Sequence, residues 1–340
     1  MTAGELSVDK NGAATYSIPL WLTPGTAGME PKLSLNYSSQ AGAGIAGFGW
    51  SVGGISAITR GGQTLAVDGA ITGVNYSSSD RFYSDGQRLV NVADANGLLG
   101  FYGADGTEYR TEIESFTRFV SKGARGTGPD WFKAWTKAGL ILEYGNTLDA
   151  ARDAGTRQEA LSWHVNRISD TVSNYMTFTY AEDTTAGTHR IERIDYTGNT
   201  GASTLPFASV RFEYETRSDP ASGFLYGVKL QSTHRLKHLK VYYGEQLVRT
   251  YSFGYVVSGP SSRSLLQSIT ETGSDGVSLP ALTFDYSISA SGFALEAEAN
   301  HTPPVGLARD GNQRGTGFID LDGDGFPDFV QHLVDIGTEE

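Results

Sequence analysis

Apolar side chains recur at every second position over most of the chain, whereas the spacing of three and four residues that marks a helix is rare. Residues 161–165 (LSWHV) and 175–180 (YMTFTY) show this alternation clearly. A period of two places the apolar side chains on one face of a strand, and antiparallel sheets commonly pack one face and expose the other. The same spacing is seen at Ile18, Leu20 and Leu22; Leu33, Leu35 and Tyr37; Ile194 and Tyr196; Val210, Phe212 and Tyr214; Leu239, Val241 and Tyr243; Tyr251, Phe253 and Tyr255; and Leu282, Phe284 and Tyr286.

Turn-forming residues separate these segments. TPGTAGMEP (23–31) lies between the first two alternating runs, and RISDTVSN (167–174) separates the pair quoted above, so both pairs are expected to form hairpins. The runs follow one another more widely than in a compact sandwich, which favours an extended, curling sheet. We therefore predict an all-β fold built on a large curved antiparallel sheet of hairpins. The best helix candidate is TLDAARDAGTRQEAL (147–161), although Gly155 interrupts it.

A change of composition after Tyr286 indicates a domain boundary. The stretch that follows is small, polar and proline-containing, as linkers are. We expect a β domain over residues 1–290, a linker over 291–312, and the start of a second β domain over 313–340. The first 17 residues lack the basic end and apolar run of a signal peptide, and the chain stops just after a new motif begins. We expect it to be cut from a longer chain.

Composition narrows the classes of partner. The 340 residues include 43 glycines and no cysteine, so disulfides and thiolate metal sites are excluded. The net charge of −12 argues against nucleic acid and against an anionic membrane surface, because both need concentrated Lys and Arg. No apolar run approaches the length of a membrane-spanning helix, so membrane insertion by this chain is not expected.

The segment DLDGDGFPD (320–328) has the spacing of a calcium loop. Asp320, Asp322, Asp324 and Asp328 occupy positions 1, 3, 5 and 9, and the carbonyl of Phe326 falls at position 7. Hard carboxylate oxygens at this spacing can wrap one cation. Position 12 is a glutamine and no helical pattern flanks the loop, so this is not an EF-hand. We predict a structural Ca²⁺ site, the alternative being an acidic turn without metal.

The glycine-rich stretch GAGIAGFGWSVGG (42–54) centres on Trp50. A phosphate-binding loop is also glycine-rich, but it leads from a strand into a helix. Here strand-like alternation resumes after the loop, so we interpret the glycines as backbone turns packed around Trp50.

Candidate catalytic residues are sparse. EAE at 296–298 has the paired glutamates of mono-ADP-ribosyltransferases without their Ser-Thr-Ser strand, and it falls in the expected linker. Glu112 and Glu114 could serve a glycoside hydrolase, and alternation would place both on one strand face. His234 and His238 form a weak pair, and neither HExxH nor GxSxG occurs. We expect no catalytic activity from this chain, a hydrolase on a β scaffold being the least favoured alternative.

The opening block YSIPLWLTPGTAGMEPKLSLNYSSQAGAGIAGFGWSVGGISAITR (16–60) closely resembles the SpvB/TcaC family, which comprises the Salmonella plasmid virulence protein B and the B components of insecticidal toxin complexes. DRFYSDGQRLV (80–90), FYGADGTEYRTEIESFTRF (101–119) and LSWHVNRISDTVSNYMTFTY (161–180) are similar to later blocks of the same domain. The resemblance spans about residues 5–290. The aspartate loop resembles FG-GAP/VCBS-type repeats, which build a β-propeller after this domain.

The resemblance implies a secreted, non-enzymatic toxin module. In this family the region is similar to RHS/YD-repeat sheet and forms part of a hollow β-shell around a toxic C-terminal domain. The implied partners are the rest of its own toxin chain and the A and C components of a toxin complex. The alternative from another class is an RHS-like surface scaffold for adhesion or carbohydrate binding.

Overall fold

The computed structural model describes residues 4–259, 261–286, 316–319 and 328–331. The chain divides into two compact units, residues 1–290 and 291–340. Nearly all of the regular secondary structure in the described residues is β-strand, and the helix α1 (Leu65–Asp68) is a single turn. The predicted all-β fold with a large curved antiparallel sheet is therefore confirmed.

One part of the first unit is a closed barrel of eight antiparallel strands. The ring closes because β15 pairs with β13 on one side and with β7 on the other. Closure leaves these strands without a free edge, which removes a site of unwanted strand pairing. The barrel strands are β7 (Ala57–Gly61), β8 (Arg81–Ser84), β9 (Gln87–Val92), β10 (Glu108–Thr111), β11 (Arg118–Lys122), β12 (Trp131–Trp135), β13 (Ile141–Tyr144) and β15 (Ala160–Ser169).

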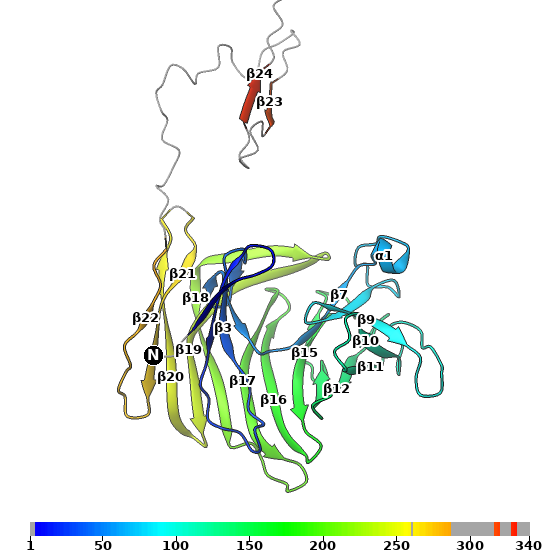
Figure 1. The fold of residues 1–340 in the computed structure, drawn as a ribbon, viewed down its shortest axis with the longest axis horizontal. Helices are drawn as coiled ribbons and strands as arrows, with labels where there is room; N and C mark the ends of the chain where they lie inside the picture. Colours follow the sequence, from blue (N-terminus) through cyan, green and yellow to red (C-terminus); the bar gives the residue numbers. More distant parts are fainter. Residues whose placement is uncertain (1–3, 260, 287–315, 320–327, 332–340) are drawn as a thin grey trace, which may run out of the picture. The chain divides into compact units, whose positions relative to one another are not determined.

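From β15 the hydrogen bonding continues into a curved antiparallel sheet (Figure 1). Each strand pairs with the next one in the chain, as expected for successive hairpins. The short strand β14 (Ala151–Asp153) pairs with β15 beside this path. The remaining strands are β16 (Asn174–Asp183), β17 (Thr188–Asn199), β18 (Ala208–Leu225), β19 (Val228–Tyr243), β20 (Gln246–Val257), β21 (Ser264–Gly273) and β22 (Leu282–Thr283).

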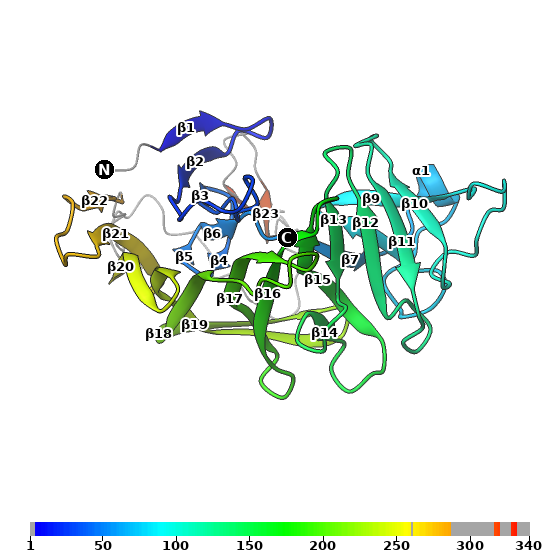
Figure 2. The same ribbon diagram turned by 90° about the horizontal axis from the view of Figure 1, so that it is seen from below.

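The N-terminal residues form a separate four-stranded sheet on the concave side of the curved sheet (Figure 2). Its order is β1 (Glu5–Val8), β2 (Ala14–Pro19), β3 (Ser34–Ser38) and β6 (Trp50–Gly53). The hairpin predicted around TPGTAGMEP is confirmed, since Ile18 of β2 lies opposite Leu35 of β3. A two-stranded ribbon, β4 (Ala43–Gly44) and β5 (Gly47–Phe48), precedes β6.

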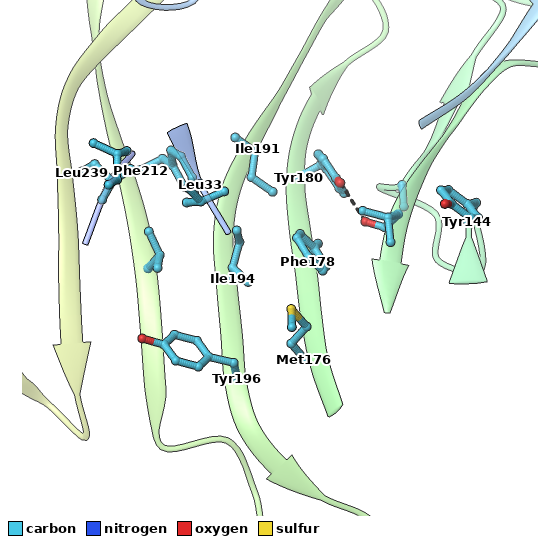
Figure 3. Packing of buried hydrophobic residues seen from close by; sticks show 14 of the residues in the cluster. Leu33, Tyr144, Met176, Phe178, Tyr180, Ile191, Ile194, Tyr196, Phe212 and Leu239 are labelled. Carbon is cyan, nitrogen blue, oxygen red and sulfur yellow. Dashed lines mark hydrogen bonds between the residues drawn. The ribbon is translucent and has the colours of Figure 1, made fainter. Parts of the chain in front are cut away.

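The main core lies between these two sheets and extends into the barrel. Side chains that alternate along β16 to β19 point to one face, where the N-terminal sheet covers them (Figure 3). Figure 3 labels Leu33, which immediately precedes β3, among the side chains of the large sheet. The barrel interior is filled by aromatic rings, including Phe82, Phe132 and Trp163, in edge-to-face contact.

The helix predicted over residues 147–161 is wrong. Within this segment Ala151 pairs with Trp163 in the β14–β15 ladder, and Gly155 adopts a positive φ of 66° in the turn between the strands. Ala150, Ala151 and Ala160 are fully buried. Packing of these small residues in the main core outweighs a local helical preference of a few tenths of a kcal/mol per residue.

The described part of the second unit is a two-stranded antiparallel hairpin. Its strands are β23 (Thr316–Ile319) and β24 (Asp328–Gln331), with Phe318 opposite Phe329.

Candidate functional site

The glycine-rich stretch around Trp50 forms an interlock between the two sheets. A Cβ on Gly44 would lie 1.9 Å from the carbonyl oxygen of Trp50, and Gly47 has a φ of 101°, where a Cβ would lie 3.1 Å from the carbonyl oxygen of Ser264. The carbonyl of Ile45 accepts the amide of Leu236 in β19 at 2.7 Å. Only glycine allows so close an approach of backbone to backbone. The interpretation of these glycines as packed turns is confirmed.

An open aromatic pocket of about 400 Å³ lies beside Trp50. The Trp50 indole is only 2% exposed, contacts the ring of Phe284 at a centroid distance of 4.8 Å, and donates its Nε1–H to the Tyr286 hydroxyl at 3.1 Å. That hydroxyl donates in turn to the carbonyl of Leu266. Trp50 therefore fastens the end of the large sheet to the N-terminal sheet. The pocket is lined by Leu6, Tyr16, Tyr37, Trp50, Leu282, Thr283, Phe284, Asp285 and Tyr286.

The far halves of β18 and β19 leave the sheet as a two-stranded arm, residues 216–234. The arm reaches across toward β14 and the barrel (Figure 2). At its tip the Tyr76 hydroxyl donates to the carbonyl of Tyr226 at 3.1 Å, and Val228 packs on Tyr76. The arm thereby ties the barrel to the curved sheet.

A buried ion pair holds the base of the arm. The side chains of Arg217 and Asp219 are 0% and 4% exposed and lie 3.0 Å apart. Arg217 also donates to the carbonyl of Gly44, and Asp219 accepts the amide of Ser264 at 2.8 Å. Burial alone would raise the pKa of Asp219, but the hydrogen bonds from Arg217 and Ser264 hold that pKa well below its ordinary value.

A second buried pair lies at one end of the barrel. Nη1 of Arg60 lies 2.9 Å from Oδ2 of Asp80, and the side chains are 1% and 0% exposed. Nε of Arg60 donates to the carbonyl of Ala160, and the guanidinium lies 5.2 Å from the Trp163 ring centroid. Desolvation lowers the pKa of Arg60. These contacts are those of a structural clamp, because both partners are shielded from solvent.

The opposite, polar face of the large sheet carries a row of cations that are each paired. Arg193, Arg211 and Lys240 are opposite one another across β17, β18 and β19. Their carboxylate partners are Asp195 at 2.6 Å, Glu245 at 3.2 Å and Glu213 at 2.7 Å, respectively. Paired charges of this kind contribute little to stability and leave the face polar but locally neutral.

The predicted calcium ligands cannot be compared with the structure. Asp320, Asp322, Asp324 and Phe326 lie outside the described residues, and Asp328 is the first residue of β24. The EAE motif at 296–298 also lies outside them. In the described ranges no group of three or more His, Asp or Glu side chains could hold a metal ion.

The structure does not bring the other candidate residues into a catalytic arrangement. Glu112 and Glu114 lie in the β10–β11 loop rather than on one strand face, and Glu114 accepts the amide of Phe116. The strand prediction for this pair is wrong because β10 ends at Thr111, whose hydroxyl starts a side-chain turn with Ser115. His234 and His238 lie on β19, where each bonds a neighbouring hydroxyl, of Thr233 and Ser252, respectively.

Sequence reasoning missed a part-buried Ser162–His164 contact on β15. The Ser162 hydroxyl lies 3.1 Å from Nε2 of His164. Ser162 is 6% exposed, and the His164 ring stacks on His189. A hydroxyl so shielded cannot reach a substrate, so the contact is structural. The alternation that places Trp163 on the inward face places Ser162 and His164 on the opposite face, which would be polar and exposed. In the structure β14 and the β16–β17 hairpin cover that face.

Among the described residues no helix is long and apolar enough to cross a membrane.

Comparison with known proteins identifies relatives of the fold. The sequence profile of a family described as "Salmonella virulence plasmid 65kDa B protein" matches residues 8–204. A search of the curated proteins gives no match. The solved N-terminal domain of effector protein SpvB from Salmonella typhimurium strain LT2 is 20% identical with a TM-score of 0.59, over 79% of this chain and 99% of that one.

Larger toxin assemblies share the fold as well. The structure of TcdB2-TccC3 is 19% identical with a TM-score of 0.65, over 84% of this chain and 17% of that one. The Tc holotoxin pore of Photorhabdus luminescens is 18% identical with a TM-score of 0.67, over 97% of this chain and 18% of that one. The chain thus spans about a sixth of the length of these two. Because the family profile covers more than half of its residues, the chain belongs to the family of the Salmonella virulence plasmid 65 kDa B protein.

Proposed function

We propose that this chain is the N-terminal, non-enzymatic module of a secreted bacterial toxin. It forms part of a β-shell that encapsulates or delivers a toxic domain located further along the same polypeptide. The observation that carries the proposal is the curved sheet itself, which continues from a closed barrel and is covered on its concave side by a second sheet.

The ends of the wall suit continuation by further strands. At one side the barrel closes the sheet on itself, whereas β22 at the other side is two residues long and pairs with β21. A strand at a sheet edge carries backbone groups that can pair with another strand. Further strands of the same toxin chain would extend the wall from β22. The other proposed partners are the A and C components of a toxin complex, in keeping with the assemblies that share this fold.

The absence of catalysis is part of the proposal. The side chains of the pairs Arg60–Asp80 and Arg217–Asp219 are at most 4% exposed, and Ser162 beside His164 is 6% exposed. Incubation of this chain with labelled NAD⁺ and actin tests the transferase alternative, and a panel of chromogenic glycosides tests the hydrolase alternative. We expect no transfer of label from NAD⁺ to actin and no hydrolysis of the glycosides.

The second unit is proposed to begin an FG-GAP/VCBS-type β-propeller that follows a linker. A short hairpin, β23 and β24, flanks the aspartate loop on both sides, as a metal-binding turn between two blade strands requires. The proposed role of Ca²⁺ is structural: it would neutralise Asp320, Asp322, Asp324 and Asp328 and fix the turn.

Protease protection tests encapsulation directly. The complete reading frame that contains this chain is expressed, and the toxic domain downstream is followed by antibody during digestion. Encapsulation predicts that this domain survives far longer within the assembly than when it is expressed alone. Equal rates of digestion would refute encapsulation while leaving the fold and family unaffected.

The aromatic pocket beside Trp50 supports a second candidate function, an adhesion or carbohydrate-binding scaffold. Sugars stack on aromatic rings, and Tyr16, Tyr37 and Phe284 line an open pocket. A glycan array probed with this chain, with Tyr37→Ala as the matched variant, distinguishes the two candidates. Binding that is lost in the variant favours the scaffold, and no binding favours the shell.

A further inference from the structure

The joint between the barrel and the curved sheet is made at one strand, β15. Its first half pairs with β7 and β14, and its second half pairs with β13 and β16. The pairing of β16 with β15 ends at Thr177, and from there on β16 pairs with β17 alone. The first half of β15 is therefore separated from β16, and residues 149–153 and side chains lie between them.

Three aromatic rings, each in contact with the other two, fill this space, and we call them the ring column: His164 of β15, His189 of β17 and Tyr180 of β16. The His164 and Tyr180 centroids are 5.3 Å apart at 52°. The His164 and His189 centroids are 4.2 Å apart at 30°, and those of His189 and Tyr180 are 5.0 Å apart at 22°. The Tyr180 hydroxyl donates to the carbonyl of Val165 at 2.7 Å, the bond dashed in Figure 3. The column thus connects the barrel strand to the β16–β17 hairpin.

The hydrogen bond of His189 defines the tautomer of its neutral ring. Nε2 of His189 lies 2.9 Å from the carbonyl oxygen of Asp149. Because a carbonyl only accepts, Nε2 carries the proton and Nδ1 of the neutral ring is bare. Nε2 of His164 lies 3.1 Å from the Ser162 hydroxyl, which can serve either role.

Burial and the nearby Arg152 oppose protonation of the two histidines, whereas Asp149 favours protonation of His189. Burial is the main cause that lowers the pKa of His189 to about 4; Arg152 acts in the same direction, and the bond to the Asp149 carbonyl and the charge of Asp149 act against it. Burial, His189 and Arg152 together hold the pKa of His164 well below its ordinary value. Arg152 is fixed there by donating to the carbonyl of Gly187 at 2.8 Å.

The neighbouring carboxylates are already engaged. Oδ2 of Asp149 accepts the amide of Tyr180 at 2.8 Å, and Glu182 accepts the amide of Asp153 at 3.1 Å. A cavity of about 100 Å³ adjoins His189 on the side of the arm. The titratable and charged groups that face the column or this cavity are Arg125, Asp149, Arg152, Asp153, Tyr180, Glu182, Arg190 and His234.

We propose that this joint is an acid-sensitive latch: protonation of His164 and His189 places two adjacent cations beside Arg152, and β15 with the barrel separates from the β16–β17 hairpin. The inference concerns the fold alone and does not rest on the proposed function. In the open joint both rings are solvated and titrate near 6.5. Below about pH 6.5 each histidine is protonated in the open joint and not in the closed one. The ratio of open to closed molecules therefore rises by up to about tenfold per histidine for every pH unit, until the pH reaches the pKa of that histidine in the closed joint.

The rest of the first unit should stay folded over this range. The pKa of Asp68, which pairs with Arg88 in the barrel, is about 2, and that of Asp219 at the base of the arm is also held low. These carboxylates keep their charges at pH 5. Acidification to pH 5 therefore opens the joint between two bodies whose own ion pairs remain intact.

The sequence makes the test simple, because it contains no cysteine. Spin labels are placed on Asn96→Cys in the barrel and Ser274→Cys beyond β21, both exposed, and their distance distribution is measured at pH 7.5, 6 and 5. We expect one distance at pH 7.5 and a second population that grows at least tenfold by pH 5. His164→Phe with His189→Gln, which keeps a ring and a donor, should abolish that growth. His238→Gln on the polar face should leave it unchanged.

A distance distribution that does not change between pH 7.5 and 5 overturns the latch, as does an unchanged response in the double variant. If the double variant does not fold at pH 7.5, hydrogen exchange of the unaltered chain decides. The amides of Asp153, His164 and Tyr180 should lose protection at pH 5 relative to those of Tyr109 and Phe119 in the barrel, after correction for intrinsic rates. Equal changes in both sets overturn the proposal.

Discussion

The substitution Asp80→Ala probes how the barrel end is held together. It removes the partner of Arg60 and leaves a guanidinium whose side chain is 1% exposed. Breaking a buried ion pair from one side costs about 3–5 kcal/mol, because the remaining charge is neither solvated nor paired. Asp80 also accepts the amides of Asn75 and Tyr76 at 3.0 Å, so its loss leaves two further donors without an acceptor. We expect a loss of at least about 3 kcal/mol.

Equilibrium unfolding in urea at pH 7 measures this loss. Glu245→Ala is the matched control, because it removes the partner of Arg211 where Glu245 is 86% exposed, and such a pair is worth about 0–1 kcal/mol. Removing both charges as Arg60→Met with Asp80→Leu should recover part of the loss, since apolar replacements of buried pairs are often tolerated. The reasoning is refuted if Asp80→Ala and Glu245→Ala lie within about 1 kcal/mol of each other.

Four further outcomes are expected. Gly44→Ala should lower the free energy of unfolding by at least about 2 kcal/mol, because its Cβ would lie 1.9 Å from a carbonyl oxygen. Gly12→Ala, at a position with open space around it, should lower it by about 1 kcal/mol. Equal losses in urea melts would contradict the interlock. Trp163→Ala should cost about 3–5 kcal/mol, and a cost below about 1 would mean the barrel interior is not close-packed. The folded pKa of Asp68, about 2, lies below the unfolded value of 3.8, so the stabilisation from this carboxylate is present above about pH 4 and lost toward pH 2. Asp68→Asn should therefore lower the free energy of unfolding at pH 6 but not at pH 2. A difference in unfolding free energy that does not change with pH would contradict the ion pair. In a chain extended through complete propeller blades, a chelator should lower the Tm and Asp322→Ala should abolish that shift; no shift in either would exclude the calcium site.

Alternation predicted the strands well because a half-buried sheet imposes a period of two over long distances. The β15–β16 hairpin has the turn at 170–173 that its sequence indicated, and Ile168 lies opposite Met176. The hairpin predicted from Ile18 and Leu35 was equally local, since each strand pairs with its neighbour in the chain.

Closure of the barrel could not be predicted in the same way. It depends on the pairing of β15 with β7, which joins Trp163 to Ile58 across about a hundred residues. Alternation is identical in an open and a closed sheet, so it carries no information about this contact. The arm was missed for the same reason, because its strands alternate like those of the sheet that they leave.

The candidate site was predicted only where backbone geometry dominates. Glycines around Trp50 signalled close backbone contact, which the structure shows. The ring column gave no signal, because His164 and His189 come from separate hairpins and meet only in the folded chain.

The central claim is that this chain is a section of wall. An electron cryomicroscopy map of the protein encoded by its complete reading frame tests that claim most directly. The account predicts that the sheet continues beyond β22 by backbone hydrogen bonds to further strands and closes around density for the downstream domain. A map in which β22 is the last strand and the downstream domain lies outside the sheet would contradict it.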